Sequence, residues 1–515
     1  MRSKITALKG HRYSVAMPSK VDIEARRHLA RPDGQEDICF GLWYPSDGNE
    51  RTTALLHSLI LPNDGDRRVH GNASFQPCYF ERALDLAVAE GAGLALLHSH
   101  PASGWQNMSH DDIDAESSHA AAAKGATGVP LLGLTLGAHD GAWSARHWQK
   151  TAPRVYERRW CETVRVVGDA LGVTYYDHLL PRPKLRPELH RTVSSWGEEP
   201  QARLARLRIG VVGAGSVGSM IAEALARMGV ARVDLFDFDA VEQVNLDRLL
   251  HATRWDALLG RAKVDVMARA LRRNATAADF QVGAYEWSIV EEEGFRQALD
   301  CDLLFSCVDR PWPRFVLNTI AYAHLIPVID GGVFAEMTRR GDGLKRADWR
   351  AHVAAPGRRC LECLEQFDPG LVGTEKAGLL ADPAYIQGLP EKHPLRRNEN
   401  VFAFSMGCAS LEILQMLSLI ITPLGIGNVG AQTYHAVDGS LDTDHRGCDE
   451  SCLYAHSLLA RGDASGFIVT GQHEAAESAR SERRVRKATF RYRTLAAVES
   501  TLEKLQESLT RSLLR

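Results

Sequence analysis

Short apolar runs alternate with an amphipathic segment in the first 150 residues of the chain. The runs at 53–60 (TALLHSLI) and 94–97 (LALL) have the composition of buried strands, and the segment 80–90 (FERALDLAVAE) has the 3.6-residue apolar spacing of a helix. PLLGLTLG and the following GAHDGAWSARHW predict further strands around a Gly/Asp turn. We therefore expect a first α/β unit that ends near residue 150.

A proline-rich stretch separates this unit from a second pattern. Residues 177–200 contain four prolines, which remove backbone donors and disfavour a helix. From Leu204 onward the order becomes strand, helix, strand, which is typical of a parallel sheet with crossover helices. The predicted organisation is a first domain at 1–150, a linker with a helical lead-in at 151–200, a second domain at 201–460 and a helical tail at 461–515.

The tail carries two features of its own. Its last helix has an apolar stripe that needs a partner surface, formed by Leu495, Val498, Leu502, Leu505 and Leu509. A basic run lies before and within this helix, at Arg483, Arg484, Arg486, Lys487, Arg491 and Arg493. Such a run fits contact with nucleic acid or an acidic partner, or a solvated helix face. The net charge of -3 favours the solvated face and argues against a nucleic-acid partner.

Composition narrows the class of protein. The 515 residues suffice for about three domains, and 45% apolar with 24% charged residues argues against a disordered chain. The apolar stretch ASLEILQMLSLIITPLGIG is interrupted by Glu412, Gln415 and Pro423, so we expect no membrane span. The N-terminal segment lacks the apolar core of a secretory signal, and ten cysteines are too few for a disulfide framework. We expect a soluble, cytoplasmic protein whose cysteines are metal ligands, nucleophiles or buried packing.

The segment LALLHSHPASGWQNMSHDDID predicts a metal site. His98 and His100 alternate at the end of an apolar strand, so both imidazoles point to one side, and Asp112 follows Ser109 by three residues. Two nitrogens and one oxygen leave a position for water, which is the composition of a catalytic zinc site. Glu36 is the candidate carboxylate for proton transfer. An isolated pair of strand-end histidines remains the alternative, which the added Pro, Ser and Asp disfavour.

This segment resembles the JAB/MPN metalloprotease family in its Glu, HSHP and Ser-x-x-Asp motifs, over about residues 1–150. The resemblance implies an α-β-α domain in which His98, His100 and Asp112 bind zinc, while Glu36 acts as general acid/base and Ser109 helps to stabilise the oxyanion. Family members cleave isopeptide or peptide bonds after the C-terminal glycines of ubiquitin-like proteins, and some act on small substrates. The gap from His100 to Ser109 is one residue longer than the common pattern. Asp37 and Asp111 lie beside the chosen carboxylates and stay open as alternatives.

A glycine-rich loop opens the second domain. The run LRIGVVGAGSVGSMIAEALARMGVARVDLFDFD contains a strand, a helix and a second strand. Gly213, Gly215 and Gly218 lie in the first turn, and Asp237 and Asp239 end the second strand. Glycines admit phosphates close to a helix N-terminus, and an acid about 20 residues on holds ribose hydroxyls. These features alone do not separate NAD from ATP, so an NAD-dependent oxidoreductase stays an alternative.

Residues further along favour ATP. Six polar residues follow the second strand, and they comprise two amides, three cations and one carboxylate. In chain order they are Asn245, Arg248, Lys263, Asp309, Arg314 and Asn318. A triphosphate needs fixed cations and a carboxylate for magnesium, whereas hydride transfer needs neither. Singly, each has an ordinary interpretation: Arg248 fits a surface ion pair and Asp309 a helix cap. Their recurrence in order is the specific signal.

The motifs GAGSVGS, DFDAVEQVNLDR, GRAKV, CVDRPWPRFVLN and PVIDGGV resemble the ThiF/MoeB superfamily, from about Arg191 to Cys452. This is the adenylating domain shared with ubiquitin-activating enzymes, and it implies a Rossmann-like doubly wound parallel sheet. It also implies roles: ribose binding by Asp237, ordering of the site by Asp239 and Asn245, phosphate contacts by Arg248 and Lys263, and magnesium binding and adenylation at Asp309. Arg191 lies near the arginine that family members supply to a partner subunit, which implies a homodimer.

The cysteines divide into two groups. Two pairs, Cys360 with Cys363 and Cys448 with Cys452, have the spacing of a closed structural zinc site with four thiolates. Ubiquitin-activating enzymes also use a nucleophilic cysteine, but the corresponding region 371–404 contains none. Cys408 follows the apolar helical spacing of Leu411 and Leu414, so we predict a buried residue. Of the remaining cysteines, Cys307 lies in a predicted central strand, and four have no adjacent base in the sequence: Cys39, Cys78, Cys161 and Cys301.

The leading hypothesis is therefore a bifunctional enzyme of a ubiquitin-like modification pathway. A zinc-dependent (iso)peptidase would act on the tail of the modifier, and a MgATP-dependent adenylyltransferase would activate its C-terminal glycine. The alternatives are a sulfur-carrier adenylyltransferase for cofactor biosynthesis, which needs no enzyme thiol, and a scaffold that binds the modifier without turnover. Expected partners are a ubiquitin-like or sulfur-carrier protein, with a conjugating-enzyme-like protein as a further candidate.

Overall fold

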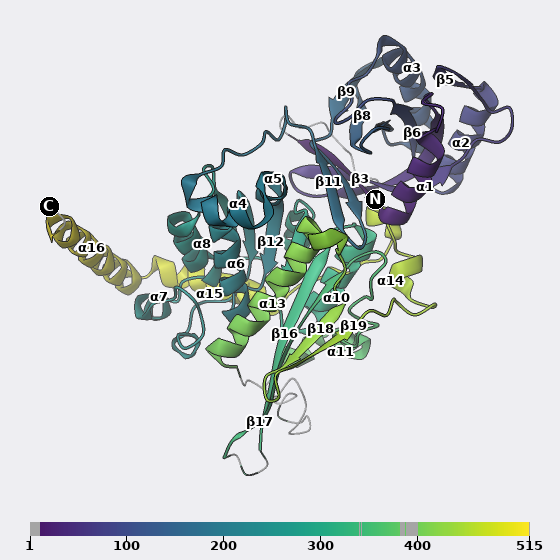
Figure 1. Ribbon diagram of the computed structural model, residues 1–515. Helices are drawn as coiled ribbons and strands as arrows, with labels where there is room; N and C mark the ends of the chain where they lie inside the picture. The colour runs from purple at the N-terminus through teal and green to yellow at the C-terminus, as the bar shows by residue number, and fades with distance from the viewer. Residues whose placement is uncertain (1–10, 339, 341, 382–386, 388–399, 514–515) are drawn as a thin grey trace.

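The computed structural model describes residues 11–338, 340, 342–381, 387 and 400–513 (Figure 1). The side chains of residues 503–513 are outside this description, so the positions of Leu505 and Leu509 in the predicted stripe are outside it too. Two large sheets organise the chain, one of nine strands and one of eight.

The first sheet has the strand order β11-β10-β1-β3-β2-β6-β7-β8-β9. Its strands are β1 (Arg12–Pro18), β2 (Ile38–Asp47), β3 (Arg51–Ile60), β6 (Gly93–His100), β7 (Leu131–Gly137), β8 (Trp143–Ala152), β9 (Val155–Trp160), β10 (Thr163–Val167) and β11 (Leu171–Tyr175). The strands and the helix expected at 53–60, 94–97 and 80–90 are present. A small hairpin, β4 (Arg67–His70) and β5 (Asn72–Phe75), lies outside this sheet.

Helices cover both faces of the first sheet. Alternation along β2 sends Cys39 and Trp43 to the face that packs with α1 (Ser19–Leu29), and Phe40 to the face that packs with α2 (Pro77–Ala89) and α3 (His110–Thr127). Because both faces are buried, the strands read as nearly continuous apolar runs. The result is the three-layer α-β-α arrangement expected for this part of the chain.

The first unit extends beyond the predicted boundary at residue 150. Strand β8 ends at Ala152, and β9, β10 and β11 continue the same sheet to Tyr175, inside the segment predicted as linker. Strand β9 (VYERRW) is mostly polar, and β10 and β11 have only five residues each, so their periodicity in the sequence is weak. After the prolines come η1 (Pro187–Leu189), α4 (His190–Trp196) and α5 (Glu198–Arg206), in agreement with the predicted helical lead-in.

The second sheet has the order β14-β13-β12-β15-β16-β17-β18-β19, in which the first five strands are parallel. In chain order these five run 3-2-1-4-5, the order of a Rossmann-like doubly wound sheet. The strands are β12 (Arg208–Val212), β13 (Arg232–Phe236), β14 (Gln281–Tyr285), β15 (Leu303–Ser306), β16 (Val328–Met337), β17 (Leu344–Ala354), β18 (Ala431–His435) and β19 (Ser440–Asp444). The predicted fold class is confirmed for this domain.

Helices also cover both faces of the second sheet (Figure 1). One face packs against α5, α6 (Ser216–Arg227), α8 (Lys263–Asn274) and α13 (Phe402–Ile421). The other packs against α9 (Glu292–Ala298), α10 (Pro311–Ala323) and α14 (Leu453–His456). Among the described residues, α13 alone is long and apolar enough to cross a membrane, by length and composition only. It lies against β16 and β17 and buries the predicted interruptions Glu412 and Gln415.

The remaining elements are short segments and the two tail helices. They are η2 (Gln243–Asn245), α7 (Arg254–Leu259), α11 (Pro369–Lys376), η3 (Leu379–Ala381), η5 (Pro423–Gly425), η6 (Gly462–Ser465), α15 (Glu474–Ala488) and α16 (Phe490–Leu513). The helical tail predicted from the apolar stripe is therefore present, and α16 projects away from the rest of the molecule (Figure 1).

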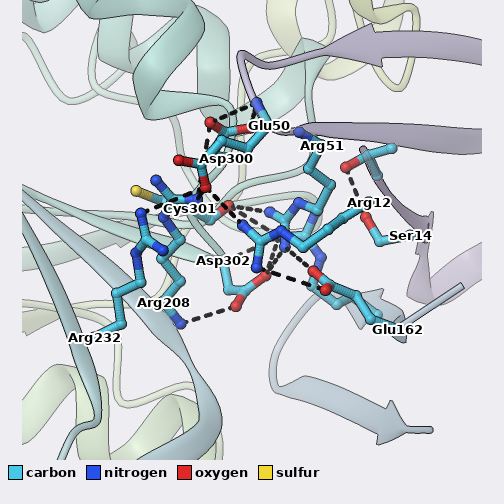
Figure 2. A network of polar contacts seen from close by, with 12 residues as sticks. Arg12, Ser14, Glu50, Arg51, Glu162, Arg208, Arg232, Asp300, Cys301 and Asp302 are labelled. Atoms are coloured by element: carbon cyan, nitrogen blue, oxygen red, sulfur yellow. Dashed lines mark hydrogen bonds and ion pairs between the residues drawn. The ribbon is translucent and has the colours of Figure 1, made fainter. Parts of the chain in front are cut away.

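A buried polar network joins the two sheets (Figure 2). Arg51, the first residue of β3, lies 2.6 Å from Asp302, which precedes β15, and donates a second hydrogen bond to the carbonyl of Cys301. Arg165 of β10 lies 3.4 Å from the same carboxylate, and Arg208 of β12 lies 2.9 Å from Glu50. The junction thus joins β3 and β10 of the first sheet to the amino ends of β12 and β15 of the second, and it buries several charges.

Candidate functional sites

The three predicted metal ligands converge at one edge of the first sheet. His98 and His100 end β6, and Asp112 lies in the first turn of α3. The histidine Nε2 atoms lie 3.2 Å apart, and they lie 3.4 and 3.3 Å from the Asp112 carboxylate oxygens. Tetrahedral zinc with bonds of about 2.0–2.1 Å needs ligand atoms about 3.3–3.4 Å apart. The spacing of the three donor atoms therefore fits zinc.

Ser109 holds Asp112 in this position. As N-cap of α3, the Ser109 hydroxyl accepts a hydrogen bond from the Asp112 backbone N–H at 3.1 Å, and the Ser109 N–H donates to the Asp112 carboxylate at 2.7 Å. The extra residue between His100 and Ser109 therefore leaves the cap geometry intact. Asp111 is exposed, so the structure selects Asp112 between the two neighbours. The oxyanion role of Ser109 stays a prediction.

Glu36 rather than Asp37 faces the histidines. A Glu36 carboxylate oxygen lies 4.0 Å from His100 Nε2, and burial raises the pKa of Glu36. Asp37 is engaged elsewhere, because it pairs with Arg67 and Arg31 and accepts a hydrogen bond from the Ile38 N–H. Burial lowers the pKa of His98 to about 3, which keeps its imidazole neutral. A neutral imidazole is the form that binds a metal.

A buried network behind these ligands was missed by the sequence analysis. Arg146 of β8 pairs with Glu116 of α3, and its Nη1 lies 2.5 Å from the Thr135 hydroxyl of β7, which lies 3.3 Å from His98 Nε2. Both Arg146 and Glu116 have no exposed surface. Glu116 is one helical turn after Asp112, so the pair fixes the helix that carries a predicted ligand. The signal available was a charged residue inside the apolar strand WSARHW.

The four cysteines predicted as a structural zinc site also meet. Their sulfur atoms all lie within 4.8 Å of one another, and Cys360 Sγ lies 3.7 Å from Cys452 Sγ. Four thiolates around zinc, with bonds of about 2.3 Å, are about 3.8 Å apart. The Cys448 sulfur also accepts a hydrogen bond from the Cys360 N–H at 3.1 Å. The four cysteines therefore fit a closed zinc site. Such a site would join the segment after β17, which carries Cys360 and Cys363, to the segment after β19, which carries Cys448 and Cys452.

The glycine loop has the geometry expected of a phosphate-binding turn. Gly213 has a φ of 94°, and a Cβ there would lie 2.4 Å from the Cys307 carbonyl oxygen. A Cβ on Gly218 would lie 1.8 Å from the Gly213 carbonyl oxygen, so neither position accepts a side chain. Gly215, the N-cap of α6, has open space around it. The N-terminus of α6 is thus accessible to an anion.

Three of the predicted nucleotide residues form one cluster at the carboxyl edge of the sheet. The Asp237 carboxylate accepts hydrogen bonds from the N–H groups of Ala214 and Asp239, at 2.8 and 2.7 Å, and burial raises its pKa to about 6. Lys263 Nζ lies 2.7 Å from the Asp239 carboxylate. Asp309, exposed between β15 and α10, acts on Lys263 electrostatically and helps to raise its pKa against burial. The arrangement offers anionic and cationic groups at the topological switch point.

The other predicted nucleotide residues make local contacts. Arg248 donates a hydrogen bond to the Val244 carbonyl and pairs with Asp247, and Asn245 caps a short turn through Glu242. Arg314 pairs instead with the buried Asp330 at 3.1 Å, and Asn318 is buried and accepts a hydrogen bond from the Leu361 N–H beside Cys360. Arg314 and Asn318 therefore support the sheet and the cysteine loop. Arg191 is exposed on α4.

The cysteines outside the cluster are mostly enclosed. Cys408 is buried as predicted, and its thiol donates to Glu412 at 3.4 Å. Burial raises the pKa of the Cys307 and Cys408 thiols, which disfavours a thiolate nucleophile. Cys78 is exposed, whereas Cys39, Cys161 and Cys301 are buried. Half of the cysteine-free region 371–404, namely 382–386 and 388–399, lies outside the described residues.

Comparison with known proteins supports the family resemblance of the second domain. Residues 188–441 match the model of the ThiF family, so the chain contains a ThiF family domain. Ubiquitin-like modifier-activating enzyme 5 of Bombyx mori is 34% identical over 122 residues, 22% of this chain and 30% of that protein. The Xenopus laevis enzyme of the same name is 30% identical over 131 residues, 24% of this chain and 32% of that protein. The chain thus spans about a third of the length of these relatives. A crystal structure of E. coli MccB with ATP is 16% identical, covers 52% of this chain and 74% of that chain, and has a TM-score of 0.40.

Proposed function

We propose that the ThiF family domain adenylates the C-terminal carboxylate of a ubiquitin-like protein or peptide, using MgATP. The observation that carries this proposal is the cluster of Asp237, Asp239 and Lys263 beside an open glycine turn, with Asp309 exposed nearby. The names of the curated relatives support a modifier as the substrate. The proposal includes a cytoplasmic location, because four thiolate ligands have to stay reduced. It also includes a homodimer, in which Arg191 would reach the nucleotide of the partner subunit.

Each residue has a chemical task in this reaction. The α6 N-terminus and Lys263 attract phosphate oxygens, because backbone N–H groups and an ammonium favour negative charge. Asp237, which directly follows β13, would bind the ribose hydroxyls. Asp309 would hold magnesium, which offsets the charge that develops on the phosphates as pyrophosphate leaves. Lys263 is then released from Asp239 to contact phosphate.

We propose further that the first domain is a zinc-dependent (iso)peptidase acting on the same kind of tail. Zinc, when bound, supplies Lewis acidity and activates water for hydrolysis. His98, His100 and Asp112 would hold it, and their spacing fits, as described above. Glu36 stands beside His100 with a raised pKa, which suits a group that takes up a proton and delivers it to a leaving amine.

The two proposed centres lie at opposite ends of the molecule. Strand β2 pairs with β3 and β6, and it runs from one centre toward the junction of the two domains. Its residue Ile38 pairs with His98, and its last residue, Asp47, lies at the junction, nine residues further along. At about 3.4 Å per residue this is about 30 Å. Gly213 likewise follows the end of β12 that points away from Arg208. A tail that leaves the first centre therefore reaches the second only after release, and the two reactions use separate encounters.

A sulfur-carrier adenylyltransferase is the second candidate. The enclosure of Cys307 and Cys408, together with a cysteine-free segment at 371–404, favours an adenylate that is attacked by an external sulfur nucleophile. Mass spectrometry distinguishes the products. A thiocarboxylate on the substrate supports this candidate, and a thioester on the enzyme supports modifier transfer.

Pyrophosphate exchange tests adenylation directly. The full chain is incubated with MgATP, labelled pyrophosphate and a Gly-Gly-ended ubiquitin-like protein encoded beside its gene. We expect exchange that depends on this substrate and is abolished by Asp309→Ala. Exchange that survives this substitution would sink the assignment of the magnesium residue. A protein that consumes no ATP with any such substrate supports the non-catalytic scaffold instead.

A further inference from the structure

The C-terminal segment beyond the ThiF family domain returns to the carboxyl edge of the second sheet. Residues 467–473 cross α10 and the loop after β14. The Gly471 N–H donates to the Val290 carbonyl at 2.8 Å, and the Trp312 indole N–H donates to the Val469 carbonyl at 2.8 Å. A Cβ on Gly471 would lie 3.1 Å from the Trp312 ring, so the backbone passes directly over this side chain. The segment therefore lies along the edge where this fold binds nucleotides.

His473 lies between the two loops that carry the proposed nucleotide residues. Its ring is 5.0 Å from the ring of Phe238, which stands between Asp237 and Asp239, in an edge-on arrangement. On its other side the ring is 6.0 Å from Trp312, three residues after Asp309. Edge-to-face packing at these distances holds an aromatic ring in one orientation. The imidazole is thus fixed beside both loops.

The Nδ1 atom of His473 is buried and has no hydrogen-bond partner within the described part of the chain. A buried polar atom without a partner costs free energy, so such atoms are uncommon unless a ligand or water satisfies them. Burial lowers the pKa of His473, which leaves a neutral imidazole able to donate from one nitrogen and accept at the other. Neutral imidazole suits the hydroxyls and ring nitrogens of a nucleoside.

Ion pairs hold the helix that follows. Arg480 of α15 donates to a Glu291 carboxylate oxygen at 2.8 Å, and Arg483 donates to Glu286 at 2.8 Å. The Arg480 guanidinium also lies 4.2 Å from the Trp287 ring centroid. The side chain of Arg483 is only 6% exposed, so this part of the basic run anchors α15 and is no solvated face. These contacts fix His473, the residue immediately before the helix.

We propose that His473 contacts the nucleoside part of the bound ATP and that the segment 467–488 forms one wall of the nucleotide site. The nucleoside end is favoured because Phe238 continues from β13, where the acid that binds ribose stands in this fold, whereas phosphates lie at the α6 N-terminus. This inference rests on the proposed ATP-dependent function. It assigns part of the site to residues outside the stretch that matches the family.

Binding of MgATP and of AMP to the full chain tests the proposal, by calorimetry. His473→Leu keeps an apolar side chain of similar size and removes the polar atoms, whereas His473→Asn retains a polar atom near the Nδ1 position. We expect His473→Leu to weaken both ligands by the same factor, about fivefold to tenfold, and His473→Asn to recover most of the affinity. His456→Leu, at an exposed histidine of α14, is the matched control and should bind as the unaltered protein does.

The outcomes separate the inference from the function on which it rests. If Lys263→Ala weakens ATP binding and His473→Leu leaves the affinity within twofold, the His473 contact is refuted and the proposed function stands. If His473→Leu weakened the binding of ATP but not of AMP, the proposed nucleoside contact would also be overturned, because the contact would then lie at the phosphates. Absence of ATP binding by the unaltered protein would refute both. Equal thermal midpoints of the nucleotide-free variants exclude misfolding as the cause.

Discussion

Removal of Asp302 provides a quantitative test of how the two domains are joined (Figure 2). Its carboxylate lies 2.6 Å from Arg51 Nη1 and 3.4 Å from Arg165 Nη1, and it accepts a hydrogen bond from the Arg208 N–H at 2.9 Å. Both arginine side chains are at most 2% exposed. Asp302→Ala leaves them buried without their main counter-charge. Breaking a buried pair in this way costs about 3–5 kcal/mol.

Thermal unfolding followed by tryptophan fluorescence measures this cost. For a unit of about 150–250 residues, 1 kcal/mol corresponds to about 2–4 °C, so about 4 kcal/mol lowers the midpoint by roughly 8–16 °C. Glu157→Ala is the control, because its pair with Arg159 is about half exposed on both sides and contributes under about 1 kcal/mol. A midpoint for Asp302→Ala within about 2 °C of the control would refute the reasoning that this carboxylate neutralises buried charge at the junction.

Four further predictions concern the sites. Cys360→Ser should lower the zinc content measured by metal analysis by one equivalent, whereas Cys78→Ser, at an exposed cysteine, should not. Glu36→Gln should retain zinc in the first domain and lose hydrolysis, and lost zinc would argue against the proton-transfer role. Glu116→Gln should weaken zinc binding there and cost about 3 kcal/mol, because Arg146 loses its buried counter-charge. The raised pKa of Asp237, about 6 against 3.8, means that the folded protein binds the extra proton, so nucleotide-free stability should fall as pH rises from about 4 to 6. Asp237→Asn should abolish this slope in thermal midpoints, and an unchanged slope would contradict the assignment.

Local motifs predicted which side chains meet better than they predicted the domain boundary. His98, His100 and Asp112 meet because strand alternation and a capping box fix these side chains within about fifteen residues of one another. Their role as zinc ligands stays a prediction. The cysteine pairs were recognised by their spacing alone. The boundary at residue 150 was placed too early, since β9 and β10 show no strong apolar alternation and are recognised only by their pairing with β8 and β1.

Roles that depend on long-range contacts escaped the sequence analysis. Arg314 and Asn318 have the residue types of a phosphate and metal site, yet they bind Asp330 and the cysteine loop. The other five residues of the basic run are exposed, as a solvated face requires, but Arg483 is buried against Glu286. Charged side chains take whichever partner the fold brings near, and the sequence does not contain that distance.

The sequence by itself determined which residue types could serve a metal site and a nucleotide site, because the candidate ligands and the glycine turn lie in short segments with well-defined local geometry. Only the tertiary structure decided how those segments are placed. It put Arg51, Arg165 and Asp302 into one buried junction, and His98 and Gly213 lie at or beyond the strand ends that point away from this junction. It also brought His473 back to Phe238, a distance in sequence that periodicity cannot bridge. Strand pairing and packing between distant segments set these positions, so they appear only once the chain is folded.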